Sequence, residues 1–269
     1  MAWLEIRIHT ALAEKREILI SFLAEENFES FAETEDDLLA YIHADNYIRE
    51  KVEKICDQSE VKFTEKQIPD KNWNAEWEKN FEPVLIAGKC YIRAPFHAPK
   101  AGIPYEIIIE PKMSFGTAHH ETTAMMIELM LQMNFQGKKV LDMGCGTGIL
   151  AILAGKMGAA GVDAIDNDSW AFSNSLENME RNYAGIVTVK MGDVDTAGSG
   201  YDIILANINR NVLTSQVPEY SKRMIKGELL MSGFYQEDLP MIRHTAESNA
   251  FMFDRYIIKN QWVAARFIK

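Results

Sequence analysis

Residues Lys139 to Leu150 read KVLDMGCGTGIL and contain the pattern that decides the fold. An apolar β-type run is followed by three alternating glycines and then by a second apolar run. The glycines are Gly144, Gly146 and Gly148. Glycine has no Cβ, so it permits positive φ and close approach of a ligand to the backbone, while the first amides of a helix point at that ligand. The stretch predicts a strand, a tight turn and a helix that bind a nucleotide-type ligand.

The spacing of the glycines and one carboxylate indicate the character of this ligand. The pattern is G-x-G-x-G, whereas dinucleotide-binding folds use G-x-G-x-x-G. Asp142 stands two residues before the first glycine, where its charge would oppose a pyrophosphate and suit a cation. We therefore expect Asp142 and the three glycines to contribute to the binding of a cationic ligand.

Composition limits the class of protein. The 269 residues are 47% hydrophobic and 25% charged, which is typical of a globular protein with one catalytic domain and one small domain. The net charge of −11 disfavours nonspecific binding to nucleic acid or acidic membranes and favours a basic partner. The three cysteines lie far apart, and neither a signal-peptide pattern nor a long apolar run occurs. We predict a cytoplasmic, monomeric protein without disulfides, membrane spans or stable nucleic-acid binding.

The first 66 residues predict a small domain. Their apolar spacing indicates the order βαββαβ, which is the ferredoxin-like α+β pattern. Residues 67–81 form a polar segment around Trp73 and Trp77, which indicates a linker, and residues 82–269 are expected to form the catalytic domain. The small domain is predicted to recognise substrate, with a structural appendage as the alternative.

A polar loop, FGTAHHETT, ends at Thr123 and leads into a helix. The hydroxyls of Thr117 and Thr123 are candidates for ligand binding, and local capping is the alternative role. Adjacent His119 and His120 suggest a metal, but neighbouring helix positions point about 100° apart and the two-histidine zinc motif places its histidines four apart. We predict no metal site.

Three further polar side chains follow predicted strands, namely Asp166, Asp193 and Asn207. Alternating strands and helices predict a parallel sheet whose strands end at one edge, so these side chains would share a crevice with the glycine turn. Asp166 is placed to accept ribose hydroxyls, Asp193 an exocyclic adenine amine, and Asn207 lies at the reacting centre. A cofactor with ribose, adenine and positive charge but no phosphate is S-adenosyl-methionine.

The remaining pattern completes a Rossmann-like α/β fold with a mostly parallel seven-stranded sheet. The helix capped by Asp168 is predicted to bury one apolar stripe, consisting of Phe172, Leu176, Met179 and Tyr183. Aromatic-rich strands at residues 251–258 and 261–267 predict a C-terminal antiparallel hairpin.

From residue 113 onward the chain resembles the bacterial methyltransferases that modify ribosomal protein L11 of the large subunit, a family of class I S-adenosyl-methionine-dependent enzymes. The resemblance is carried by FGTAHHETT, LDMGCGTGILAI, AIDND and LANINRNVL. It implies cofactor contacts at Thr123, Gly144, Asp166 and Asn207. It also implies that Thr117 and Asn207 lie near the transferred methyl group. Ala118 departs from the glycine usual in the first motif.

This resemblance implies methylation of amines of ribosomal protein L11, on lysine side chains and the N-terminal amine, with the small domain binding the ribosomal protein. Asn207 would accept a hydrogen bond from the neutral amine, or merely cap the turn. Another protein, a small amine or RNA is the alternative acceptor. An NAD-dependent oxidoreductase is disfavoured by the glycine spacing, and a catalytically inactive binding module by the complete set of ligand residues.

Overall fold

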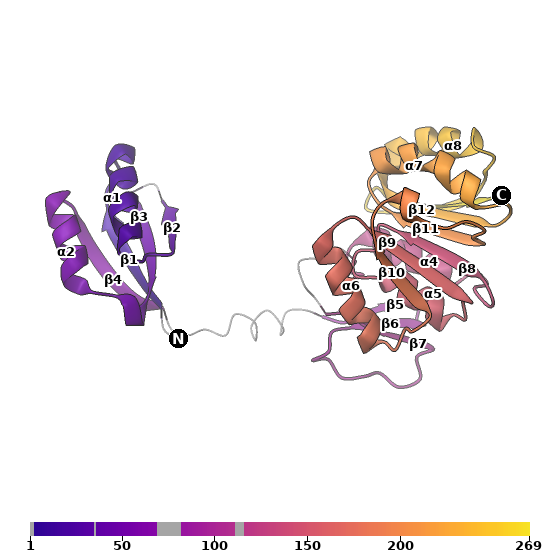
Figure 1. The fold of residues 1–269 in the computed structure, drawn as a ribbon, viewed down its shortest axis with the longest axis horizontal. Coiled ribbons are helices and arrows are strands. Elements are labelled where there is room, and N and C mark those ends of the chain that lie inside the picture. The colour runs from indigo at the N-terminus through magenta and orange to yellow at the C-terminus, as the bar shows by residue number, and fades with distance from the viewer. Residues whose placement is uncertain (1–2, 35, 69–81, 111–115) are drawn as a thin grey trace. The chain divides into compact units, whose positions relative to one another are not determined.

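The computed structural model describes residues 3–34, 36–68, 82–110 and 116–269. It divides into two compact units, Met1–Asn80 and Phe81–Lys269, whose helices and strands are labelled in Figure 1. The predicted linker residues Trp73 and Trp77 lie outside the described residues. No helix in the described ranges is long and apolar enough to cross a lipid bilayer.

The first unit is an antiparallel four-stranded sheet with two helices, in the predicted order βαββαβ. Its strand order is β2-β3-β1-β4. The elements are β1 (Trp3–His9), α1 (Ala13–Glu25), β2 (Ser30–Glu33), β3 (Asp37–His43), a 3-10 turn η1 (Ala44–Asn46), α2 (Arg49–Gln58) and β4 (Lys62–Ile68). Alternate residues of the central strands, such as Ile6 and Ile8, pack against Leu19 and Leu23 of α1. One face of the sheet is therefore buried by the helices.

The second unit contains a seven-stranded sheet in the order β10-β9-β8-β11-β12-β14-β13. Strands β10, β9, β8, β11 and β12 are parallel, whereas β14 pairs antiparallel with both β12 and β13. The strands are β8 (Lys139–Met143), β9 (Gly161–Asp166), β10 (Val187–Met191), β11 (Ile203–Asn207), β12 (Glu228–Tyr235), β13 (Met252–Lys259) and β14 (Trp262–Ile268). The predicted sheet and its C-terminal hairpin are confirmed.

Helices cover both faces of this sheet because successive strand residues point to opposite sides. Val140 lies in a core with α4 (Glu121–Met130), α5 (Ile149–Lys156) and α6 (Ser169–Arg181). Leu141 lies in the opposite core with α7 (Arg210–Arg223) and α8 (Leu239–Glu247), which lie together on one side of the sheet in Figure 1. The described part of this unit also contains the 3-10 turns η2 (Val194–Thr196) and η3 (Gln236–Asp238).

The buried face of α6 differs from the predicted apolar stripe. Met179 is buried and Phe172 is half-buried, but Leu176 and Tyr183 are exposed. A second, three-stranded sheet explains the difference; it contains β5 (Val84–Ile86), β6 (Cys90–Arg93) and β7 (Tyr105–Ile108).

Asparagines of α6 occupy the buried face instead, because backbone groups of the neighbouring segments need partners there. The Asn182 side chain accepts from the Ile108 amide at 2.9 Å and donates to the Ile108 carbonyl at 2.7 Å. Asn178 accepts from the Glu110 amide at 2.9 Å and donates to the Thr147 carbonyl at 3.0 Å. Buried backbone groups left unpaired are costly, so polar side chains are required on this face.

Candidate functional site

A cavity of about 1000 Å³ lies where β8, β9, β10 and β11 end. The turn after β8, the loops after β9 and β10, and the segment after β11 all contribute to its wall, as the strand order requires of neighbouring parallel strands. Of the predicted site residues, Thr123, Gly144, Gly146, Asp166, Asp193 and Asn207 line this cavity. Thr117, Asp142 and Gly148 do not line it.

The glycine turn presents its backbone to the cavity and is hydrogen-bonded to Asp166. Gly144 has φ +70°, and a Cβ built on it would lie 2.2 Å from the Ile208 Cγ2 atom, so only glycine fits. The Gly146 amide donates to Asp166 Oδ2 at 2.8 Å, and the Asp168 amide donates to Asp166 Oδ1 at 3.0 Å. These bonds fix the Asp166 carboxylate at the end of β9, on the cavity wall.

Asp142 lies beneath the turn rather than in the cavity. Its side chain is 1% exposed, and Oδ2 accepts a hydrogen bond from the Ala151 amide at 3.0 Å. The N-cap residue of α5 is Gly148, which has no side chain to bind the free amides of the first turn, so Asp142 performs that task. Burial raises the pKa of Asp142 to about 7. Asp142 and Gly148 thus stabilise the turn and the start of α5, and other residues form the cavity wall.

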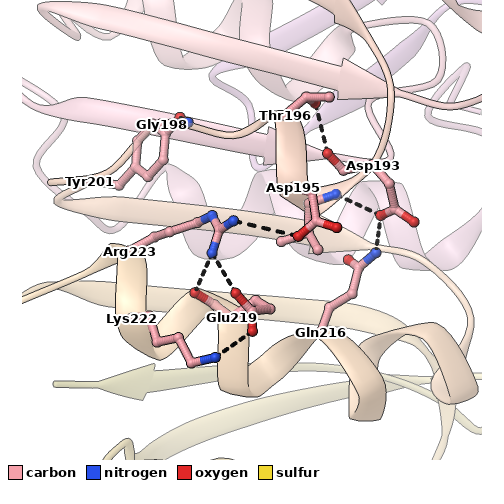
Figure 2. A network of polar contacts seen from close by, with 10 residues as sticks. Asp193, Asp195, Thr196, Gly198, Tyr201, Gln216, Glu219, Lys222 and Arg223 are labelled. Atoms are coloured by element: carbon pink, nitrogen blue, oxygen red, sulfur yellow. Dashed lines mark hydrogen bonds and ion pairs between the residues drawn. The ribbon is translucent and has the colours of Figure 1, made fainter.

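Asp193 lies on the cavity wall at the end of β10. Its Oδ1 atom accepts a hydrogen bond from the Val194 amide at 2.6 Å and another from Gln216 Nε2. Figure 2 shows this contact between the η2 segment and the long helix α7. The carboxylate is therefore held by both the strand end that carries it and the helix opposite.

Asn207, the last residue of β11, has one paired and one unpaired polar atom. Its Nδ2 donates to Thr123 Oγ1 at 3.2 Å, which ties it to the first turn of α4. Its Oδ1 is buried and has no hydrogen-bond partner among the described residues. A buried carbonyl oxygen without a partner costs about 1–3 kcal/mol, so its retention in a cavity points to a ligand donor.

The polar side chains of the loop before α4 bond partly with one another and partly with distant backbone, as His119 Nε2 does with the Glu82 carbonyl at 2.9 Å. Thr117 Oγ1 bonds with His119 Nδ1 at 3.1 Å, and the Thr122 amide donates to His120 Nδ1 at the start of α4. Ala118 is buried and has φ +68°, a left-handed conformation that costs a non-glycine residue about 1–2 kcal/mol. The departure from glycine in this motif therefore leaves the turn in place but strained.

The lining residues determine which ligands the cavity suits. Three aspartates line it, and neither lysine nor arginine does so among the described residues; the aspartates are Asp166, Asp168 and Asp193. Such a wall accepts hydrogen bonds from hydroxyls and amines and opposes phosphate, which pairs with arginine or lysine. The unpaired Asn207 Oδ1 adds a further acceptor. These residues fit the ribose, the adenine amine and the positive charge of S-adenosyl-methionine.

A family model described as Ribosomal protein L11 methyltransferase (PrmA) matches residues 3–269. The chain belongs to the ribosomal protein L11 methyltransferase family. A protein of that name from Phocaeicola vulgatus is 41% identical over all of this chain and 99% of its own length. Another from Bacteroides thetaiotaomicron is 42% identical, with 99% of each chain covered. The crystal structure of a ribosomal protein L11 methylase from Lactobacillus delbrueckii subsp. bulgaricus has a TM-score of 0.65 at 24% identity and covers 70% of this chain and 98% of its own.

Membership of the L11 methyltransferase family confirms the resemblance, the fold class and the enzyme class that the sequence predicts. It also excludes the NAD-dependent oxidoreductase as an account of the cavity. The roles of the individual residues remain predictions that rest on the geometry given above.

In this L11 methyltransferase family member the cavity is also lined by residues that the sequence does not mark. Trp170 lines the cavity and is 77% exposed, and Gln216 reaches it from α7. Trp262 lines the cavity from β14, with the Tyr235 ring 4.1 Å and the His120 ring 4.9 Å from it between centroids. These three residues cannot be found from the ends of the parallel strands, because they come from helices and from an antiparallel strand. The aromatic character of the last two strands is the one signal that could have found Trp262.

Proposed function

We propose that this chain transfers methyl groups from S-adenosyl-methionine to amines of ribosomal protein L11, on lysine side chains and the N-terminal amine. The single observation that carries the proposal is the Asn207 Oδ1 atom, buried and unpaired on the wall of a cavity rich in acceptors. The substrate class follows from the family. The net charge of −11 suits a basic protein substrate.

In this proposal the cofactor is bound by residues that lie where the parallel strands end. Asp166 accepts the ribose hydroxyls, Asp193 accepts the adenine amine, and the backbone of Gly144 and Gly146 lies against the ligand. Each carboxylate is already oriented by backbone amides, which reduces the entropy lost on binding. S-adenosyl-methionine supplies, when bound, a methyl group that is already strongly electrophilic.

The remaining task of the chain is to present a neutral amine in the correct direction. A lysine amine has a pKa near 10.4 in water, so it must lose its proton before it can react, and desolvation in a cavity favours the neutral form. Asn207 Oδ1 accepts a hydrogen bond from that amine and directs its lone pair. Thr123 holds the amide so that Oδ1 faces the substrate. Alignment of this kind can supply roughly 7–11 kcal/mol of the barrier.

The domain assignment belongs to the same proposal. We assign substrate recognition to the predicted domain of residues 1–66, which the structure extends to the end of β4 at Ile68, and catalysis to residues 82–269, with the linker between them. The first unit is compact by itself, which supports a separate role in recognition. A cytoplasmic location and a monomeric state stay predictions.

The proposal is tested by incubating unmethylated L11 protein with the purified chain and S-adenosyl-methionine and then analysing the products by tandem mass spectrometry. Methyl groups on lysine side chains and on the N-terminal amine are the expected result. A parallel reaction uses cell extract and labelled cofactor with and without ribonuclease. Label that appears only in small molecules, in other proteins or in a ribonuclease-sensitive fraction would reject L11 while leaving the methyltransferase assignment intact.

A further inference from the structure

The inference concerns the two residues of α7 that hold Asp193, Gln216 and Tyr220, and it rests on the proposed binding of S-adenosyl-methionine. Gln216 Nε2 donates to Asp193 Oδ1, and the Tyr220 hydroxyl donates to Gln216 Oε1. Gln216 is 5% exposed and Tyr220 is fully buried. The three side chains form a chain of hydrogen bonds that runs from the core to the cavity wall.

The direction of these bonds is fixed by the Asp193 carboxylate at one end and is compatible with the buried tyrosine at the other. Burial, and after it the negative charge of Asp193, raise the pKa of Tyr220, so its hydroxyl stays protonated and donates. The Asp193 carboxylate only accepts, so the NH₂ group of Gln216 must face it and the amide oxygen faces Tyr220, whose hydroxyl is the donor. The reverse orientation would bring the amide oxygen against a carboxylate oxygen, with no proton between them.

These bonds involve one carboxylate oxygen of Asp193 and not the other. Oδ1 accepts from both the Val194 amide and Gln216, whereas Oδ2 receives no hydrogen bond from a described residue. Asp193 and Gln216 both line the cavity, but both polar atoms of the Gln216 side chain are engaged by protein groups. Asp193 is thus the member of the pair that remains able to accept a bond from a ligand.

We propose that Gln216 and Tyr220 are positioning residues that hold Asp193 as a fixed acceptor, so that the cavity selects a purine with an amino group at position 6 over one with an oxo group. An amino group donates to the carboxylate. An oxo group presents a second acceptor to it, and a fixed carboxylate cannot turn away. A carboxylate free to rotate would lose this discrimination.

The experiment compares the binding of S-adenosylhomocysteine and S-inosylhomocysteine, measured by calorimetry on the full chain. Wild-type protein should bind the adenosine compound at least about 30-fold more tightly, since a site that bonds a ligand group rejects an analogue lacking it. Gln216→Leu, which keeps the volume but removes both bonds, should reduce this ratio several-fold. Gln136→Leu, at an exposed position outside the cavity, serves as the matched control and should leave the ratio unchanged.

A second variant gives a readout that a purely structural role would not produce. Gln216→Glu places a carboxylate against Asp193, so affinity for the adenosine compound should be low at pH 8 and recover towards pH 5, as one carboxyl of the pair becomes protonated. Wild-type affinity should change much less over this range. The other ionisable groups near the pair are Asp166 on the cavity wall and, from η2 and α7, Asp195, Glu219, Lys222 and Arg223, most of which Figure 2 shows.

The outcomes separate this inference from the proposed function. Tight binding of the adenosine compound with an unchanged ratio in folded Gln216→Leu protein would overturn the positioning role alone. A flat pH profile for Gln216→Glu would do the same. Failure of wild-type protein to bind either nucleoside would instead reject the proposed cofactor site. Circular dichroism of each variant establishes that the chain is folded with the helical content of wild-type protein.

Discussion

The turn between β8 and α5 and the end of β11 lie at the same edge of the sheet, yet they use their polar groups in opposite ways. In the turn, the Asp142 carboxylate accepts from Ala151, and the Gly146 amide donates to Asp166. At the end of β11, Asn207 is tied to Thr123 through Nδ2 and keeps a buried Oδ1 without a partner among the described residues. These polar groups around the turn are paired with protein groups, whereas the strand end retains an atom for a ligand.

The contrast shows that the stretch most easily recognised in the sequence is chiefly a scaffold. Its glycines permit a backbone path, and its aspartate holds the helix that follows. The reactive contribution is assigned to a residue in a less regular stretch. Substitutions in the turn should therefore change stability or cofactor binding, while substitution of Asn207 should change turnover.

Asp166 is expected to give the largest effect on cofactor binding, because its carboxylate both bonds the turn and lies on the cavity wall. Asp166→Ala removes the proposed ribose acceptor and leaves the Gly146 amide without its bond. We expect affinity for S-adenosyl-methionine to fall about 100-fold, since bonds to charged groups contribute about 1.5–3 kcal/mol each. Calorimetric titration measures this, with the exposed Asp57→Ala of the first unit as control. An unchanged dissociation constant would reject the ribose role.

Gly144 lies at the contact between the two regions, because its missing Cβ makes room for Ile208, the neighbour of Asn207. Gly144→Ala should lower the free energy of unfolding by about 2–3 kcal/mol, from left-handed strain and from the clash. Gly137→Ala is the matched control, since Gly137 has φ +71° but no atom within 4 Å of a built Cβ. Urea denaturation should show a clearly smaller loss for Gly137→Ala, and equal losses would remove the steric argument.

Substitution of Asp142 tests whether its buried carboxylate has a structural role beneath the turn. Its folded pKa is raised to about 7 from an ordinary 3.8, so the folded state binds more protons than the unfolded state between about pH 4 and 7. The contribution of this group to stability therefore decreases as pH rises through that window. Asp142→Asn keeps an acceptor for Ala151 and removes the titration. Its stability relative to wild type should therefore rise between pH 4 and 8 by on the order of 4 kcal/mol, since each pKa unit corresponds to about 1.4 kcal/mol. A constant difference across this range would contradict the assignment.

Asp168 should give the smallest effect. Its side chain caps α6 beside the cavity and is not bonded to the backbone of the glycine turn. Oδ1 accepts from the Trp170 and Ala171 amides at 2.7 and 3.0 Å. Asp168→Ala should reduce stability by about 1 kcal/mol, and Asp168→Asn should restore most of it because asparagine caps equally well. Thermal melts of the two variants provide the measurement, and equal destabilisation by both would argue against capping.

Elements with strong local patterns are predictable from the sequence, and so is the edge where strands end. The alternation around Val140 and Leu141 and the acids after β9 and β10 follow from period and connection rules. The face of α6 does not follow, since Asn178 and Asn182 are buried to satisfy the backbone of a distant strand, and no periodicity reports a partner 74 residues away.

The site is predictable to the same extent. Strand ends identify Asp166, Asp193 and Asn207, but nothing local shows that Asp142 points beneath the turn or that Gln216 crosses from a helix to the wall. Both depend on side-chain direction after packing. Trp170 and Trp262 are missed for the same reason, since they enter the cavity from elements outside the parallel strand ends.

The measurement that tests the central claim most directly is the rate of methyl transfer to L11 by Asn207→Ala protein at saturating S-adenosyl-methionine, with the cofactor dissociation constant determined in parallel. Loss of one preorganised contact at a reacting group typically costs about 100–1000-fold in turnover. We expect a loss of that size with cofactor affinity within a few fold of wild type, and no loss for Asn211→Ala, an exposed asparagine of α7 outside the cavity lining. Wild-type turnover by the Asn207→Ala protein would contradict the account.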